Sequence, residues 1–204
     1  IRTDLRAPTL MLQSESDVLG VLNFYPARQP DSDTVRTWEM AGTAHVDEYL
    51  LGPITSAFDC GAEINDGPMN FILKAGLRAL DTWVRDGTAP PKAEPFKTEE
   101  AEGEVRYVRD EDGIVEGGVR TPPVDVPTRV VSGEPGPSAD VVCLLAGSTI
   151  PMSPGRLKTL YGTASDYRTE YEKATDDAIK AGFVLKEDRK ALLDEAQPEL
   201  IGKG

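Results

Sequence analysis

The sequence predicts an α/β fold in which amphipathic helices cover a small sheet of buried strands. Two short apolar segments, residues 9–14 and 35–41, have the length of buried strands and are flanked by polar residues. A longer segment from Pro68 to Arg85 has apolar residues spaced by threes and fours, which is the pattern of a helix with one buried face. Strand, loop, strand and helix in this order indicate a sheet with a helix packed against it.

Each of these elements has recognisable ends. The strand at 9–14 stops before the polar residues 15–17, so we expect it to end in a loop. Residues 27–33, which lie between the two strands, are rich in Pro and Asp, and such residues favour turns. Pro68 suits the first turn of the helix, and Gly87 suits the position just after its last turn.

The segment 88–104 predicts a linker. It is rich in Pro at first and then strongly acidic, a composition typical of a solvated connection. We therefore divide the chain into a core at 1–87, this linker, and an extension at 105–204 that packs on the core. The extension either wraps onto the core or shapes the mouth of a pocket, and the sequence leaves both possibilities open.

The extension begins with a predicted hairpin. Residues 105–108 and 114–115 flank an Asp-Gly turn, which is a strong signal for two paired strands. The acidic residues at 109–113 lack the ligand spacing of a calcium-binding EF-hand, so we interpret them as surface residues of the turn. The segment 117–127 contains three prolines and is therefore expected to be extended.

The end of the chain predicts helices. Ser153 followed by Pro is typical of a helix start, and a stripe of tyrosine and alanine then continues to Gly182. We interpret Tyr167 and Tyr171 in this stripe as packing residues rather than ligands. A last, shorter helix is expected around 187–196.

Composition and charge exclude several classes of partner. The chain has 204 residues, of which 39% are hydrophobic, enough to bury a core. Its net charge of -13 argues against nucleic acid or an anionic membrane surface, because both would be repelled. No apolar run reaches the roughly 18 residues that a membrane span needs. Because the first residue is Ile1 rather than Met, we expect the chain to begin within a longer protein, and the lack of a signal peptide is then uninformative.

The two cysteines, Cys60 and Cys143, are too few for a disulfide scaffold and lack the spacing of metal ligands. They are either two buried thiols or one long-range disulfide. A disulfide requires that their Cα atoms lie within about 7 Å, and it would indicate an oxidising compartment. The sequence pattern alone does not decide between the two.

The one histidine of the chain, His45, is the first candidate for chemistry. A single histidine is more often structural than catalytic, but here Asp17 strengthens the case. Each of the two residues follows the end of a predicted strand, and active sites of open α/β sheets are built at that edge. A carboxylate that accepts a hydrogen bond from an imidazole fixes its tautomer and lets it act as a general base, as in a catalytic triad.

The chain resembles α/β-hydrolases over nearly its whole length. Segments 8–17 and 38–45 resemble the last two core strands of that fold with their acid and histidine loops, and 68–85 resembles the helix that closes it. Further segments resemble a bacterial group of α/β-hydrolase domain proteins, namely 65–68, 118–127 and 145–151.

This resemblance implies a serine hydrolase that acts on small carboxylic esters without a metal or other cofactor, while lactones and amides stay open as substrates. Asp17 would be the acid of the triad and His45 the base. Glu15 is the main competitor of Asp17 and is otherwise a supporting or surface acid, whereas Asp47 is expected to cap the following turn. Members of such groups are often exported, which favours an exported protein with a Cys60–Cys143 disulfide.

The sequence departs from the family at the nucleophile. It contains no G-x-S-x-G motif. The most similar serine-containing segment, 146–151, lacks the second glycine and the strand-turn-helix context of a nucleophile elbow. The backbone amides of an oxyanion hole are also missing. We therefore expect the C-terminal part of a hydrolase, inactive alone, whose nucleophile lies on an N-terminal half carried by a preceding segment or a second polypeptide. A half-sheet would expose an unpaired edge and an apolar face, so it needs that partner.

Two other interpretations of the function remain open. The chain could be a hydrolase-like binding module without catalysis, since folds carry unrelated functions. It could also be a structural domain in which His45 has no carboxylate within hydrogen-bond reach. Metal-dependent hydrolysis is the least favoured, because one histidine and scattered acids do not converge on a metal site.

Overall fold

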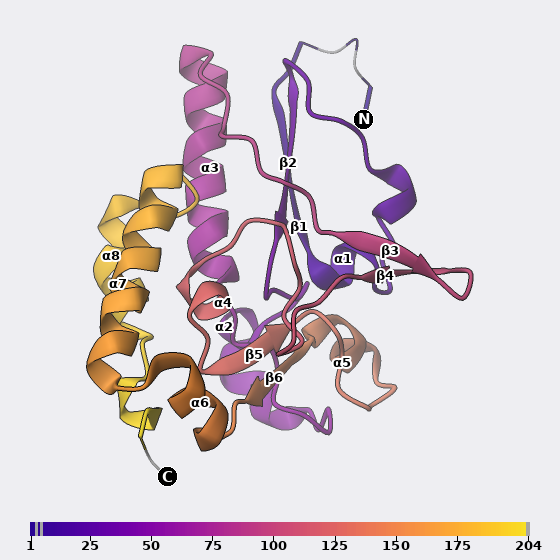
Figure 1. Cartoon of the computed structure of the whole chain (residues 1–204). Helices are drawn as coiled ribbons and strands as arrows, with labels where there is room; N and C mark the ends of the chain where they lie inside the picture. Colours follow the sequence, from indigo (N-terminus) through magenta and orange to yellow (C-terminus); the bar gives the residue numbers. More distant parts are fainter. Residues whose placement is uncertain (3, 5, 203–204) are drawn as a thin grey trace.

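The computed structural model describes residues 1–2, 4 and 6–202 and has the predicted α/β class (Figure 1). Strands β1 (Thr9–Ser14) and β2 (Val35–Met40) lie parallel, with Thr9 opposite Val35. Helix α3 (Met69–Asp86) packs on one face of this pair. The two predicted strands and the predicted helix are thus confirmed, with ends within a residue or so of those expected.

Helix α3 owes its position to one apolar face and a close approach. Its side chains Ile72 and Ala75 pack with Trp38 and Met40 of β2 in one buried cluster. Gly76 allows the helix to approach β1, because a Cβ there would lie 2.9 Å from a methyl of Leu12. The helix is therefore seated on the sheet by shape as well as by hydrophobic burial.

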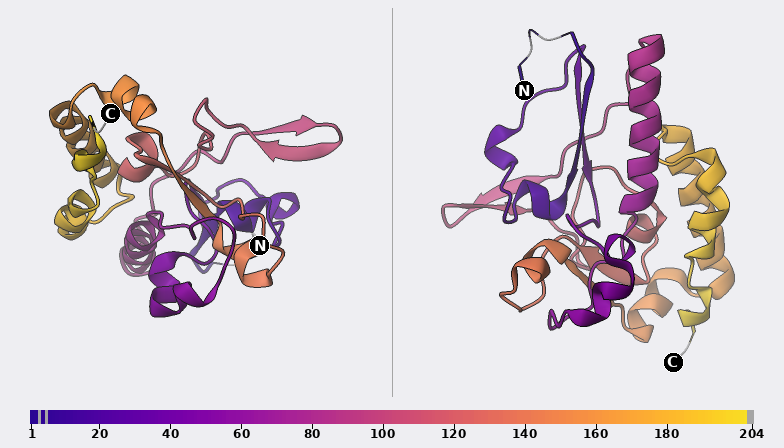
Figure 2. Two further views of the ribbon diagram at one scale, coloured as in Figure 1. Left: turned by 90° about the horizontal axis from the view of Figure 1, so that it is seen from below. Right: turned by 180° about the vertical axis from the view of Figure 1, so that it is seen from behind.

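A layer of C-terminal helices covers the far side of α3 (Figure 2). Helices α6 (Pro154–Tyr161), α7 (Ala164–Ala181) and α8 (Arg189–Asp194) follow one another at the end of the chain. The predicted start at Ser153 and end at Gly182 are confirmed, but the intervening segment is two helices, because Gly162 and the capping Thr163 interrupt it. Tyr167 and Tyr171 of the predicted stripe are packing residues, as expected, and are buried in one cluster with Tyr161 of α6.

The hairpin prediction is only partly correct. Strand β4 (Glu104–Tyr107) pairs with β3 (Thr98–Ala101) instead of with residues 114–115. The connecting Glu102 and Gly103 both have positive φ, which suits a tight two-residue turn between β3 and β4. The Asp-Gly turn nevertheless exists, closed by a bridge between Arg109 and Val115.

The β3–β4 hairpin projects from the body as an arm (Figure 1). Its acidic side chains face solvent on a two-stranded ribbon, which is why this stretch resembles a linker in sequence. Strand β3 thus falls inside the predicted linker at 88–104. The division into 1–87, 88–104 and 105–204 stays a prediction, and residues 3, 5 and 203–204 lie outside the described residues.

The extended prediction for 117–127 is wrong at one point. Pro122–Asp125 form the one-turn helix α4, whose first two positions are proline. Proline is tolerated there because the N–H groups of a first helical turn have no partner within the helix. The prolines therefore start a turn of helix instead of excluding one.

A third two-stranded sheet was not foreseen. Strands β5 (Arg129–Ser132) and β6 (Ser148–Pro151) are antiparallel, and α5 (Val141–Ala146) lies between them in sequence. The remaining elements are short helices, namely α1 (Glu15–Val18), α2 (Glu48–Leu51) and the 3-10 helices Tyr25–Ala27, Gly52–Ala57, Lys186–Asp188 and Pro198–Leu200.

Cys60 and Cys143 form a disulfide with Cα atoms 5.3 Å apart. It ties the segment after α2 to α5, and both sulfurs lie in a buried cluster with Ile64 and Ala146. Throughout the described ranges, the helices are too short or too polar to cross a membrane.

Candidate active site

The carboxylate of Asp17 is held by the turn that ends β1. Ser14 is the N-cap of α1, and Asp17 is the third residue of that helix, so the two form a capping box. The backbone N–H and the hydroxyl of Ser14 donate to Asp17 Oδ2 at 2.7 and 2.8 Å, and the Asp17 N–H donates to Ser14 Oγ at 3.3 Å. The local sequence thus fixes one carboxylate oxygen and leaves Oδ1 available.

The histidine loop begins with a tight turn after β2. Gly42 has φ +71°, and a Cβ there would lie 2.6 Å from Val124 and 2.7 Å from Val131. Only glycine therefore fits this left-handed position without strain. Three residues later, the backbone N–H of His45 donates to Ser16 Oγ at 2.7 Å, which ties the histidine loop to α1.

The two loops bring His45 and Asp17 into contact. His45 Nδ1 lies 2.6 Å from Asp17 Oδ1. The histidine side chain is 46% exposed and the aspartate side chain 13% exposed, so the aspartate is the more buried of the two. A carboxylate accepts, so Nδ1 carries the proton in this contact and leaves the lone pair on Nε2. Nε2 makes no hydrogen bond to any residue that the structure describes. The pair has the geometry of a general base with its orienting acid.

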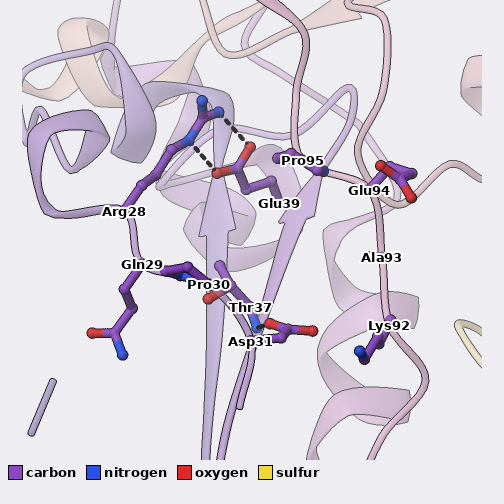
Figure 3. Close-up of a pocket in the computed structure, with 10 residues that line it drawn as sticks. All are labelled: Arg28, Gln29, Pro30, Asp31, Thr37, Glu39, Lys92, Ala93, Glu94 and Pro95. Carbon is purple, nitrogen blue, oxygen red and sulfur yellow. Dashed lines mark hydrogen bonds and ion pairs between the residues drawn. The ribbon is translucent and has the colours of Figure 1, made fainter. Parts of the chain in front are cut away.

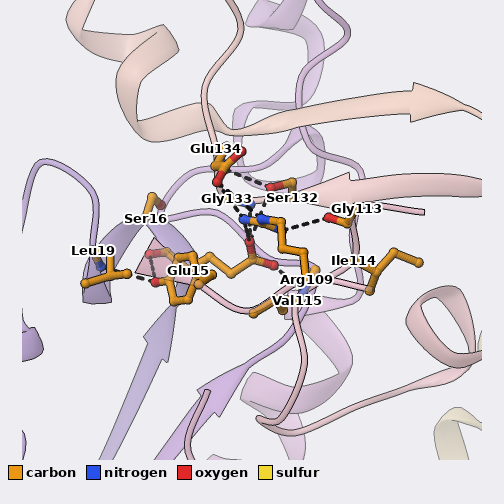
Figure 4. A network of polar contacts seen from close by, with 12 residues as sticks. Glu15, Ser16, Leu19, Arg109, Gly113, Ile114, Val115, Ser132, Gly133 and Glu134 are labelled. Carbon is orange, nitrogen blue, oxygen red and sulfur yellow. Dashed lines mark hydrogen bonds and ion pairs between the residues drawn. The ribbon is translucent and has the colours of Figure 1, made fainter. Parts of the chain in front are cut away.

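The two competing carboxylates have other partners. Glu15 is buried, with 1% exposure, and its carboxylate accepts from Arg109 and other donors of the core (Figure 4). Burial raises the pKa of the Glu15 carboxyl, and the adjacent Arg109 guanidinium opposes this rise. Asp47 accepts the Leu50 N–H at 2.8 Å and caps α2, as expected. Glu15 is therefore a supporting acid rather than a surface one.

The serine nearest to a nucleophile motif does not have the context of a nucleophile. Ser148 starts strand β6, is 6% exposed and donates its hydroxyl hydrogen to the carbonyl of Glu134 at 2.8 Å. A nucleophile elbow instead exposes its serine on a sharp turn between a strand and a helix.

A separate pocket of about 410 Å³ lies beside β2, between the loop after α1 and the segment before β3 (Figure 3). Arg28 and Glu39 of its lining are joined by two contacts of 2.7 and 2.6 Å, and Glu39 also accepts the Phe96 N–H at 2.6 Å. These charges are used to hold the segment around Phe96 against β2. The lining includes neither Asp17 nor His45.

Within the part of the chain that the structure covers, no three His, Cys, Asp or Glu side chains converge in a way that could hold a metal ion. Sequence reasoning missed Ser14, Ser16 and Arg109 as supports of the site. The Ser14 and Asp17 spacing is the sequence signature of a capping box, so that contact had a local signal. Arg109 had none, because it lies 94 residues from its partner Glu15.

The structure thus combines an α/β domain with a histidine and carboxylate contact just beyond two neighbouring parallel strands, which is the sheet edge where open α/β folds bind their ligands. A family model described as alpha/beta hydrolase domain matches residues 1–194. The chain therefore belongs to the alpha/beta hydrolase domain family, which confirms the resemblance seen in the sequence and supports a hydrolase activity. No match was found among the curated proteins. None was found among the solved structures.

Proposed function

We propose that this chain supplies the base and the acid of a serine hydrolase that acts on small carboxylic esters, with His45 as the base and Asp17 as the acid. The contact of 2.6 Å between His45 Nδ1 and Asp17 Oδ1 is the observation that carries this proposal. The exposed Nε2 faces away from that contact and takes the proton of a serine hydroxyl as the serine attacks the ester carbonyl. Asp17 stabilises the imidazolium that forms, and Nε2 then returns the proton to the leaving alcohol.

The serine and the oxyanion hole belong to another segment in this proposal, either an N-terminal half of the same protein or a second polypeptide. Two features of the fold support such a partner. Within the described residues, β1 pairs with β2 only, so its other edge carries unpaired N–H and C=O groups. Helix α3 also has an apolar stripe beside its buried face, in which Leu77 and Val84 are 65% and 63% exposed.

A further strand on the free edge of β1 and a helix on this stripe would bury both features. If that strand runs parallel to β1, its carboxyl end lies at the same sheet edge as Asp17 and His45. A nucleophile that follows a strand of this extended sheet would therefore come within reach of His45 Nε2.

A serine-directed fluorophosphonate tests this proposal. The 204-residue chain alone should not be labelled, whereas a polypeptide that also contains the upstream half should be labelled on one serine outside residues 1–204. In that longer polypeptide, His45→Ala should abolish labelling while the fold is retained. Labelling of Ser148, or normal ester hydrolysis by the His45→Ala variant, would show that the assignment is wrong.

A further inference from the structure

The carboxylate of Glu15 is a junction between four segments of the core (Figure 4). Oε1 accepts the backbone N–H of Gly42 at 2.8 Å, in the turn that leads to His45. Oε2 accepts from Arg109 Nη2 at 2.9 Å and from the Ser132 hydroxyl and the Gly133 N–H at 3.2 Å each. This buried carboxylate thus has four donors, one on Oε1 and three on Oε2, and the Arg109 donor carries a full positive charge.

The backbone of Glu15 joins the same segments a second time. Its N–H donates to the carbonyl of Thr43 at 3.1 Å, again in the histidine loop. Its own carbonyl accepts the Tyr107 hydroxyl at 2.6 Å, and that hydroxyl oxygen accepts the Leu19 N–H at 3.2 Å. Glu15 is therefore fixed at both ends by the histidine loop and by the base of the β3–β4 arm.

These contacts lie directly behind the catalytic pair. Asp17 is two residues after Glu15 in the single turn α1, and His45 is three residues after Gly42. A shift of either loop by about 1 Å would break a hydrogen bond of 2.6 Å between the two side chains. The contacts of Glu15, together with the hydrogen bond from the His45 N–H to Ser16 Oγ, set the separation of the two loops.

Apolar side chains in place of Glu15 and Arg109 would fill this part of the core and would avoid the cost of removing two charges from water. Replacing a buried ion pair by apolar residues is often neutral or stabilising, so stability alone gives little reason for Glu15 and Arg109. A carboxylate with fixed donors does something that an apolar contact does not, because its hydrogen bonds define distances and directions.

We propose that Glu15 and Arg109 are positioning residues, which hold the Asp17 loop and the His45 loop at the separation that the Asp17–His45 hydrogen bond requires. This inference rests on the function proposed for that pair. Arg109 neutralises Glu15 and connects it to the β3–β4 arm, whose Tyr107 ring lies under the guanidinium at 5.4 Å. The arm thus contributes to the geometry of the site although none of its residues touches His45.

The single histidine makes a direct test possible on the chain as it exists. In protein labelled with 15N histidine, NMR reports which ring nitrogen carries the proton and how fast that proton exchanges. The wild-type chain should show the Nδ1–H form. Glu15→Gln should weaken the Asp17–His45 contact, so that the Nδ1 proton exchanges about tenfold faster, equivalent to about 1.4 kcal/mol, and the Nε2–H form gains population.

Glu134→Gln is the matched control. Glu134 also pairs with Arg109, at 3.0 Å, but its side chain is 65% exposed and it does not contact the histidine loop. This variant should keep the wild-type histidine signals. Arg109→Lys keeps the charge but not the planar group that reaches both carboxylates, and it should give a smaller increase in exchange, about threefold.

The outcomes separate the two proposals. If the wild-type histidine does not carry its proton on Nδ1, the function proposed for the pair is wrong. If it does, and the folded Glu15→Gln and Arg109→Lys variants both keep the wild-type tautomer and exchange rate, only the positioning role is wrong. If Glu15→Gln does not fold, the Nδ1 proton exchange rates of Arg109→Lys and Glu134→Gln are compared. Equal rates in these two variants would show that the positioning role is wrong.

Discussion

Asp17→Asn is the sharpest test of the proposed site, because the contacts of Ser14 determine how the new side chain must lie. The backbone N–H of Ser14 is a fixed donor 2.7 Å from Oδ2, so the carbonyl oxygen of an asparagine must take the Oδ2 position. Its NH₂ group then occupies the Oδ1 position and faces His45 Nδ1. An amide nitrogen only donates, so Nδ1 must accept and the ring proton moves to Nε2.

The expected magnitude follows from that change of tautomer. A histidine with its proton on Nε2 cannot take a proton from serine, and the same substitution in a serine protease lowers kcat by about 10⁴, or about 5 kcal/mol. Folding stability should change much less. The capping contacts with Ser14 remain, so only the charge near a helix start is lost, which is worth about 0.3–1 kcal/mol.

Two measurements check this prediction. In the 15N-histidine NMR spectrum of the chain, Asp17→Asn should replace the Nδ1–H form by the Nε2–H form. In the longer polypeptide with the nucleophile, ester hydrolysis should fall by about four orders of magnitude while urea unfolding changes little. An Asp17→Asn variant that retains the Nδ1–H form, or full activity, would show that Asp17 does not control the histidine tautomer.

Three further predictions concern stability. Replacing both Cys60 and Cys143 by Ala should lower the free energy of unfolding in urea by up to about 4.5 kcal/mol, the loop entropy for residues 83 apart. Burial raises the pKa of Glu195 to about 7, although the charge of Arg129 acts to lower it. Between about pH 4.5 and 7, the Glu195 carboxyl therefore holds a proton in the folded chain that it has lost in the unfolded chain. Stability should therefore fall by up to about 3 kcal/mol as pH rises from about 4.5 to 7, and Glu195→Gln should remove this component. Gly42→Ala should destabilise the chain by about 2 kcal/mol or more in the same urea assay, because its φ is +71° and its Cβ would collide with two valines.

Matched variants make these results specific. Glu199→Gln changes an exposed carboxylate of the same surface hollow as Glu195 and should leave the pH dependence unchanged. Gly103→Ala has a φ of +83° but open space around its Cβ, so it should be less damaging than Gly42→Ala. Equal effects of the two alanines would contradict the collision, and a disulfide-free chain as stable as the wild type would contradict the loop-entropy estimate.

Local sequence patterns predicted the parts of the fold that depend on local forces. The apolar strands, the amphipathic α3 with Pro68 and Gly87 at its ends, and the helix start at Ser153 follow from side-chain period and end preferences. The errors arose where a neighbour distant in sequence decides. Strand β4 pairs with β3 and not with residues 114–115. The β5–β6 sheet forms between two strands that are separated in sequence by α5.

The amino-acid sequence was enough to predict the α/β class and to single out His45 and Asp17 as candidates, because strand ends and side-chain chemistry depend on residues close together in the chain. The tertiary structure decided which carboxylate meets the imidazole. Glu15 and Asp17 are two residues apart, and only the packing of Arg109 and Gly42 around Glu15 directs one inward and leaves the other for His45. Which of the two carboxylates contacts His45 depends on burial and on hydrogen-bond donors far away in sequence. A local sequence pattern predicts neither of these.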